Sequence, residues 1–157
     1  MKTASLNELK NELTSLKPVE VLALCMRLAK YKKENKELLT YLLFEANDEQ
    51  GYIESIKREI DQQLEGMNRN NLYYAKKTLR KVLRITNKYI KYSGSKQTEV
   101  ELLIYYCKKL KMAGFTVNSN SVLSNLYQRQ IQRIKKALST LHEDLQYDYK
   151  EDIESLA

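Results

Sequence analysis

The sequence predicts an all-α protein of about seven helices packed as antiparallel hairpins. Apolar residues recur at three- and four-residue spacing along almost the whole chain, which is the period of an amphipathic helix. The 157 residues include only one proline and four glycines, so the chain lacks the punctuation that many short strands require. All-β and doubly wound α/β folds are therefore disfavoured, and the length suits one domain with a hydrophobic core.

The N-terminal part of the chain predicts four helices. Thr3 or Ser5 can cap the first, and Pro18 opens the second at a position where the missing N–H of proline costs nothing. Asn35 is expected to cap the third helix, and the fourth follows Gly51. The apolar stripes that define these helices contain Leu6, Leu9, Leu13 and Leu16; Val21, Leu22, Cys25, Leu28 and Ala29; Leu38, Leu39, Leu42, Leu43 and Ala46; and Ile53, Ile56, Ile60 and Leu64.

Glycines are expected to end three of the helices. Gly66 is expected to stop the fourth by adopting the left-handed conformation, which glycine reaches without strain. A fifth helix over about residues 70–92 ends at Gly94, and a sixth over about 97–113 ends at Gly114.

The last long helix is expected to begin at a serine cap, Ser119 or Ser121. Its apolar stripe predicts that it continues to Leu145 without a break. The stripe consists of Leu123, Leu126, Tyr127, Ile134, Leu138, Leu141 and Leu145. We expect a single helical domain over residues 1–145 and an acidic tail over 146–157.

Two segments of the chain resemble each other. Val21-Leu22-x-Leu24 aligns with Val82-Leu83-x-Ile85, and after a three-residue shift Glu37-Leu38-Leu39-x-Tyr41 aligns with Glu101-Leu102-Leu103-x-Tyr105. One hairpin paired with another over about residues 20–110 resembles a short α-solenoid of the HEAT or TPR kind, although the Trp, Gly and Pro signature of TPR repeats is absent. The resemblance implies a helical-repeat surface that binds another protein. A plain up-and-down bundle, or two unrelated amphipathic hairpins, are the alternatives.

Charge is unevenly distributed along the chain. The net charge of +7 conceals a balance of 10 basic and 12 acidic side chains in residues 1–66, and 16 basic and only two acidic ones in residues 67–136. Residues 137–157 carry one lysine against six acids, Glu143, Asp144, Asp148, Glu151, Asp152 and Glu154. The middle of the chain is therefore expected to form a cationic surface. The acidic end is expected either to fray or to fold across that surface and compete with an anionic ligand.

The fifth helix concentrates the positive charge on one side. A row of cations beside an aromatic ring is typical of a helix that binds the phosphates of a nucleic acid and stacks on its bases. A second basic group on the last helix extends the surface if the two helices are neighbours. The expected anion-binding residues are Tyr73, Lys77, Arg80, Arg84, Lys88 and Lys91, with Arg129, Arg133 and Lys136. The alternative is a merely solvated or internally paired face.

The sequence contains no motif that combines residues into a catalytic site. The single histidine, His142, lies beside Glu143 with no second histidine or cysteine nearby, so neither a transition-metal site nor another cofactor site is expected. Cys25 and Cys107 both fall on apolar stripes, where we expect buried, protonated and unreactive thiols. No glycine-rich phosphate loop is present. We therefore expect no enzymatic activity.

The N-terminus predicts a cytoplasmic protein. Residues 1–15 are polar and periodic, unlike a signal peptide. The longest apolar stretch, residues 38–44, is much shorter than the roughly 18 residues that span a bilayer. The leading expectation is a non-catalytic helical module that binds another protein, and the alternative is binding of RNA or DNA, without reading of the bases, through the helix at about 70–92. No membrane partner is expected.

Overall fold

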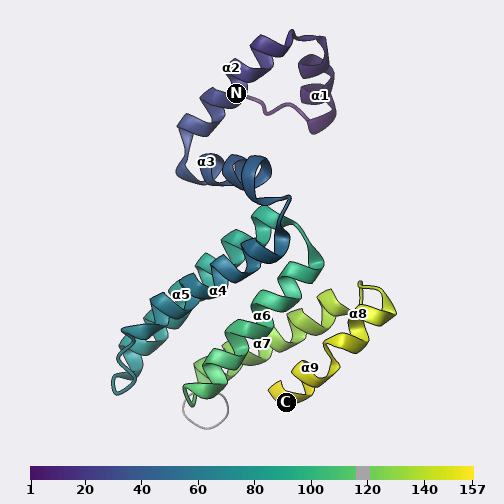
Figure 1. Cartoon of the computed structure of the whole chain (residues 1–157). Coiled ribbons are helices and arrows are strands. Elements are labelled where there is room, and N and C mark those ends of the chain that lie inside the picture. The colour runs from purple at the N-terminus through teal and green to yellow at the C-terminus, as the bar shows by residue number, and fades with distance from the viewer. Residues whose placement is uncertain (116–120) are drawn as a thin grey trace. The chain divides into compact units, whose positions relative to one another are not determined.

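The computed structural model describes residues 1–115 and 121–157, and every regular element in these ranges is helical (Figure 1). The predicted all-α fold is confirmed. The helices are α1 (Leu6–Ser15), α2 (Pro18–Tyr31), α3 (Lys33–Thr40), the π-helix η1 (Tyr41–Glu45), α4 (Glu49–Glu65), α5 (Leu72–Ser93), α6 (Lys96–Met112), α7 (Ser121–Leu138), α8 (Glu143–Asp148) and α9 (Lys150–Leu156).

Contacts divide the chain into two compact units. We call Met1–Phe44 the N-terminal unit and Glu45–Ala157 the C-terminal unit. The boundary between the two units lies inside residues 1–145, where we expected a single domain. That these residues fold as one domain stays a prediction. α2 contacts α3, and α5 contacts α6, so each half of the expected repeat is a pair of consecutive helices. The repeat itself, and its likeness to α-solenoids, stay predictions.

Local sequence sets the start of each helix in the N-terminal unit. Ser5 caps α1 as expected: it accepts from Glu8 N, while the Glu8 side chain accepts from Ser5 N, which completes a capping box. Pro18 is the first residue of α2, also as expected. The expected cap at Asn35 is wrong, because α3 already begins at Lys33. Asn35 instead donates from Nδ2 to the carbonyl of Leu28 over 2.8 Å and so ties α3 to α2.

Helix α6 is the centre of the C-terminal unit. It contacts α4, α5, α7 and α9, and Figure 1 shows α4 to α7 running side by side. These neighbours bury most of its apolar side chains, although six charged residues are spread around the circumference of the helix. The buried residues of α6 are Thr98, Glu99, Val100, Leu102, Leu103, Ile104, Tyr106, Cys107 and Leu110.

Helices α4 and α5 both end at a glycine, and one of these two glycines has the left-handed backbone conformation. Gly94 follows α5 with φ of 67°, and its N–H donates to the carbonyl of Ile90. Gly66 does follow α4, but its φ is −90°, so the expected left-handed conformation at Gly66 is wrong. Any L-residue adopts φ near −90°, and Gly66 is therefore not required there by backbone geometry.

The predicted last helix is interrupted. α7 ends at Leu138, and Leu141 and Leu145 lie beyond it, so the expectation of one helix to Leu145 is wrong. The hydroxyls of Ser139 and Thr140 donate to the carbonyls of Lys136 and Ala137 over 2.8 and 2.6 Å. These bonds satisfy carbonyls at the end of α7 and replace the next helical turn. The expected cap at Ser119 or Ser121 lies outside the residues whose side chains are described.

The acidic C-terminal segment is packed onto the unit rather than frayed. Leu156 is 2% exposed, and its carbonyl accepts from the Tyr127 hydroxyl over 2.6 Å. Lys108 on α6 pairs with Asp152 on α9, and Tyr149 donates to Glu101 over 2.8 Å. An apolar anchor and a few specific polar contacts therefore hold the segment against α6 and α7.

Candidate functional site

The predicted anion-binding residues of α5 lie in a single row. Tyr73, Lys77, Arg80, Arg84, Lys88 and Lys91 follow one another at spacings of three or four residues. At the pitch of an α-helix they fall within an arc of about 80° and extend about 27 Å along the axis. We call these six residues the cationic stripe. It lies opposite the face of α5 that is buried, which consists of Ala75, Leu79, Val82, Thr86 and Ile90.

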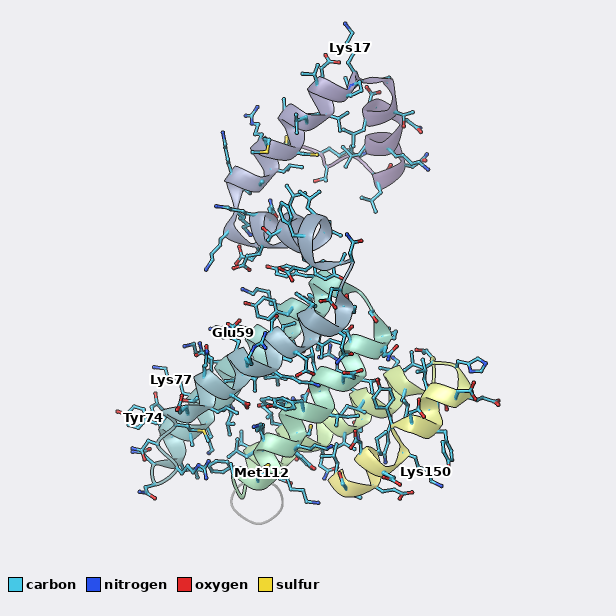
Figure 2. All side chains as sticks on the ribbon, in the orientation of Figure 1. Lys17, Glu59, Tyr74, Lys77, Met112 and Lys150 are labelled. Carbon is cyan, nitrogen blue, oxygen red and sulfur yellow. The ribbon has the colours of Figure 1, made fainter. Side chains whose placement is uncertain are left out.

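Most of the cationic stripe is open to solvent. Tyr73 is 70% exposed, and Lys77, Arg80, Arg84 and Lys91 are also exposed. Lys88 is half-buried, with its Nζ 5.0 Å from the centre of the Tyr89 ring. Figure 2 labels Tyr74 and Lys77 near the start of α5, where their side chains stand out from the ribbon.

The two tyrosines at the start of α5 are held in a fixed relation. Their rings meet edge to face, with centroids 5.4 Å apart. Asn71 accepts from the backbone N–H groups of both residues and so fixes the first turn of the helix. Both rings are more than half exposed, which leaves the face of Tyr73 available for stacking.

The sequence of α5 contains seven lysines and arginines and no acidic residue. Carboxylates of α4 bond to hydroxyls of α5: Glu59 accepts from Tyr89 over 2.8 Å, and Glu49 accepts from Ser93. Repulsion between cations four residues apart makes such a helix less stable in isolation. The positive potential along the stripe therefore comes from its own side chains and from the absence of acids within the helix.

Arg133 differs from the other predicted anion-binding residues on α7. Arg129 and Lys136 are exposed, whereas Arg133 is engaged inside the unit. Its Nε donates to Oε1 of the buried Glu99 over 2.6 Å, and its Nη1 donates to Asn87 on α5. This contact brings α5 and α7 together across α6. Arg133 thus stabilises the fold, and we do not include it in the proposed surface.

Glu99 is kept ionised by its two cationic partners. Burial acts to raise the pKa of this carboxyl group. Hydrogen bonds from Lys96 and Arg133, together with their positive charges, outweigh that effect and hold the pKa below its ordinary value of 4.5. Lys96 Nζ lies 2.8 Å from Glu99 Oε2. The pair with Arg133 is therefore a permanent charge contact at neutral pH.

The acidic segment engages lysines of α6. Lys108 pairs with Asp152, and Lys111 donates to the carbonyl of Ser155 over 2.7 Å. These lysines lie at the end of α6, outside the cationic stripe. The acidic segment therefore contacts cations of α6. The expectation that it folds across the cationic surface and competes with an anionic ligand stays a prediction.

A second candidate surface, absent from the sequence-based predictions, is the apolar exterior of the N-terminal unit. Of the 18 large apolar side chains that are exposed among the described residues, 13 belong to Met1–Phe44. No residue of α1, α2 or α3 is buried, and Tyr41 in η1 is the buried residue of the unit. A concentration of exposed apolar side chains in one unit is typical of interaction sites.

The exposed apolar side chains of α2 are not those of an ordinary amphipathic helix, which has a wide polar face. Its 14 residues include three charged ones, Glu20, Arg27 and Lys30, which fall within an arc of about 80°. The rest of its circumference is apolar, as in a helix that is covered on several sides. Leu22 and Leu28 are nevertheless 61% and 62% exposed. This composition is the signal in the sequence that predicts burial against something outside the unit.

The groove between α2 and α3 is also apolar. Its lining includes Cys25, which is exposed, so the expectation that Cys25 is a buried thiol is wrong. Within the N-terminal unit, α2 and residues 35–42 line this groove. Its lining residues are Cys25, Leu28, Ala29, Asn35, Leu38, Leu39 and Leu42.

Cys107 is buried, as expected, and burial raises the pKa of its thiol to about 12. His142 is exposed and caps α8, where its Nδ1 accepts from Asp144 N over 3.3 Å. Within residues 1–115 and 121–157, no group of three or more His, Cys, Asp or Glu residues is placed to hold a metal ion. None of the described helices is long and apolar enough to cross a bilayer.

Comparison of the chain with models of protein families, with curated proteins and with solved structures finds no match.

Proposed function

We propose that this chain is a non-catalytic helical module that binds another polypeptide through the apolar surface of its N-terminal unit. The observation that carries the proposal is α2, which is apolar around most of its circumference and has no buried residue. Helix α6 has a smaller share of apolar residues, yet it contacts four other helices and has nine buried residues. The contrast indicates that α2 lacks the cover that its sequence requires.

A polypeptide suits this surface better than a small molecule. The exposed apolar residues are distributed over α1, α2 and η1 rather than gathered in one enclosed cavity. Lysines border the apolar surface near the junction of α2 and α3, as polar residues border the apolar centre of a protein interface. These lysines are Lys30, Lys32, Lys33 and Lys36, and they lie beside Met26, Leu39, Leu43 and Phe44.

Photo-cross-linking in the native cell tests the proposal. A photoreactive phenylalanine analogue in place of Leu28, which is 62% exposed on α2, is expected to form discrete adducts with a polypeptide. The same analogue in place of Arg58, exposed on α4, serves as the matched control and is expected to form none of these adducts. Identical background from both positions would refute binding through α2.

A second candidate function is the binding of RNA or DNA by the cationic stripe, and it is favoured by a specific observation. The stripe presents five cations and one exposed tyrosine on a helix without acids. Contacts between those cations and phosphates release counterions, so log affinity falls with log salt. For single strands the expected slope is about −3.5 if all five cations are engaged.

The test of this second function compares two variants of equal net charge. Arg80→Glu with Arg84→Glu is expected to abolish retention of an oligonucleotide, while circular dichroism stays unchanged because both side chains are exposed. Arg58→Glu with Lys150→Glu changes the net charge equally at exposed positions outside the stripe, and retention is expected to persist. If both variants lost oligonucleotide retention equally, net charge alone would explain the binding. That result would contradict a binding site at the cationic stripe.

A further inference from the structure

We propose that the cationic stripe binds a single-stranded nucleic acid, and that the strand also contacts Arg129 and Lys136 on α7. The inference rests on the second candidate function and names the class of its ligand and the extent of its surface. It starts from the distribution of charge in the C-terminal unit. Helix α5 carries seven lysines and arginines and α7 carries four, and neither helix contains an acidic residue.

The carboxylates near α5 leave the middle of the stripe positive. Glu59 of α4 bonds to the hydroxyl of Tyr89, on the flank of α5 that faces α4. That flank lies about 120° or more around the helix from Lys77, Arg80 and Arg84. Among the described residues, no carboxylate pairs with any of these three cations. An anionic ligand would therefore meet them without first displacing an acidic side chain.

Arg133 joins the exposed cations of α7 to the stripe. Its Nη1 donates to Asn87, which borders the stripe on the side of α5 away from α4. Arg129 and Lys136 lie within about 60° of Arg133 around α7, so they share the face from which Arg133 reaches α5. Both are exposed, whereas the buried Glu99 pairs with the charge of Arg133. The cationic surface therefore extends from α5 to α7 across this contact.

The spacing of the stripe suits the backbone of an extended strand. Its members follow one another at three or four residues, which is about 4.5 to 6 Å along the helix axis. The row is straight over about 27 Å, so successive phosphates of an extended single strand can lie beside successive cations. The phosphates of a duplex wind around its axis instead, and a straight row meets only some of them.

Tyr73 distinguishes a single strand from other polyanions. Its ring is 70% exposed at one end of the stripe and is held edge to face against Tyr74. An unpaired base can stack on an exposed aromatic ring, whereas the bases of a duplex are already stacked on one another. An acidic polypeptide or an anionic bilayer would match the charge of the stripe and leave the ring without this contact. A single strand is the ligand that uses both the cations and the ring.

Fluorescence anisotropy of labelled oligonucleotides provides the first test. Oligothymidylate of about 12 nucleotides is expected to bind at least about tenfold more tightly than the same strand paired with oligoadenylate. Tyr73→Ala is expected to weaken binding of the single strand about fivefold or more and to leave the duplex unaffected, whereas Tyr73→Phe retains the affinity. Tyr147→Ala, at a tyrosine of α8 that is 76% exposed, is the matched control. A parallel titration with oligouridylate distinguishes RNA from DNA as the source of the strand, and tight binding of either supports the inference.

The salt dependence of the same titration tests the contacts on α7. With the five cations of the stripe and the two of α7 engaged, the slope of log affinity against log salt is expected to be about −5 for a single strand. Arg129→Gln with Lys136→Gln is expected to bring the slope to about −3.5, the value for the stripe alone. Arg58→Gln with Lys150→Gln removes the same charge at exposed positions elsewhere and is expected to leave the slope unchanged. An unchanged slope in the α7 variant would overturn the extension to α7.

The outcomes separate this inference from the second candidate function. Equal affinity for the duplex, or a Tyr73→Ala variant that binds as tightly as the unaltered protein, overturns the single strand and leaves binding of nucleic acid by the stripe standing. Displacement of the strand by polyglutamate at equal charge concentration also overturns the single strand, because stacking would then contribute nothing. If neither oligonucleotide bound at low salt, both ideas would be contradicted. A preference for the single strand that is lost in Tyr73→Ala supports both.

Discussion

Arg133 and Glu99 join α7 to α6 through a direct contact of 2.6 Å between Nε and Oε1. Glu99 is 7% exposed, although it is a charged residue on the central helix of the C-terminal unit. A buried carboxylate is tolerated only when cations and hydrogen bonds compensate for the lost water. Arg133 therefore contributes to the stability of the C-terminal unit and is not a free cation on its surface.

Removal of this arginine is expected to destabilise the protein. Arg133→Ala should lower the free energy of unfolding by about 2 kcal/mol, since it leaves Glu99 with one cationic partner while the arginine itself is partly solvated. Arg129→Ala, at an exposed position one turn earlier on α7, should change it by less than about 0.5 kcal/mol. Urea unfolding followed by circular dichroism measures both. Equal effects would contradict the role of the ion pair.

Acid is expected to weaken the C-terminal unit through Glu99. Because the pKa of Glu99 in the folded state lies below its ordinary value of 4.5, the unfolded chain takes up a proton first as the pH falls. The stabilisation is therefore complete above 4.5 and is lost as the pH falls through the folded value. In Glu99→Gln this loss is absent. Urea midpoints of the two proteins should diverge well above 4.5 and converge in acid, and a constant difference would contradict the assignment.

The buried thiol is expected to report on the opening of the C-terminal unit. In Cys25→Ser the remaining thiol, Cys107, is enclosed, and burial raises its pKa to about 12. A thiol reagent should therefore react with it only after unfolding, because the thiolate is the reactive form. Reaction rates measured against urea concentration should follow the unfolding transition. Rapid labelling in the native protein would show that α6 is not enclosed as described.

The C-terminal segment is expected to contribute stability mainly through its apolar anchor. Leu156→Ala should lower the free energy of unfolding by about 2 to 3 kcal/mol, because this side chain is 2% exposed. Asp152→Asn should change it by less than about 0.5 kcal/mol, because both members of its pair with Lys108 are about 40% exposed. Thermal and urea unfolding measure these differences. If neither change had an effect, the segment would be a frayed end after all.

Two glycines at helix ends are expected to respond differently to alanine. Gly94→Ala should cost about 1 kcal/mol, because φ is 67° at this position and a Cβ is strained there. Gly66→Ala should be neutral or slightly stabilising, because φ is −90° and nothing lies within 4 Å of an added Cβ. Urea midpoints of the two variants provide the comparison, and equal losses would contradict the assigned conformations.

The helical fold was predictable because it depends on local spacing. The apolar period, Pro18, the Ser5 cap and Gly94 each act within a few residues, so the sequence displays them directly. The end of α7 was missed for the same reason. The apolar period continues past Leu138 to Leu145, and only the hydroxyl bonds of the structure reveal that the backbone turns away.

The candidate surfaces were only partly predictable, because burial depends on which helices meet. The cationic stripe follows from the spacing within α5, and the structure leaves most of it exposed. No local pattern distinguished Arg133, which is paired, from Arg129, which is exposed, because Glu99 and Asn87 come from other helices. Cys25 was predicted to be buried and is exposed, because an apolar stripe is buried only where another helix covers it.

The central position of α6 determines how the chain unfolds. Because α4, α5, α7 and α9 all pack on this one helix, none of them can separate without exposing a shared apolar surface. The C-terminal unit is therefore expected to melt in a single cooperative transition, with helix content and the environment of Tyr106 changing together. The N-terminal unit has no such enclosed helix. Its helices are expected to exchange their amide hydrogens early, because almost none of their side chains is buried.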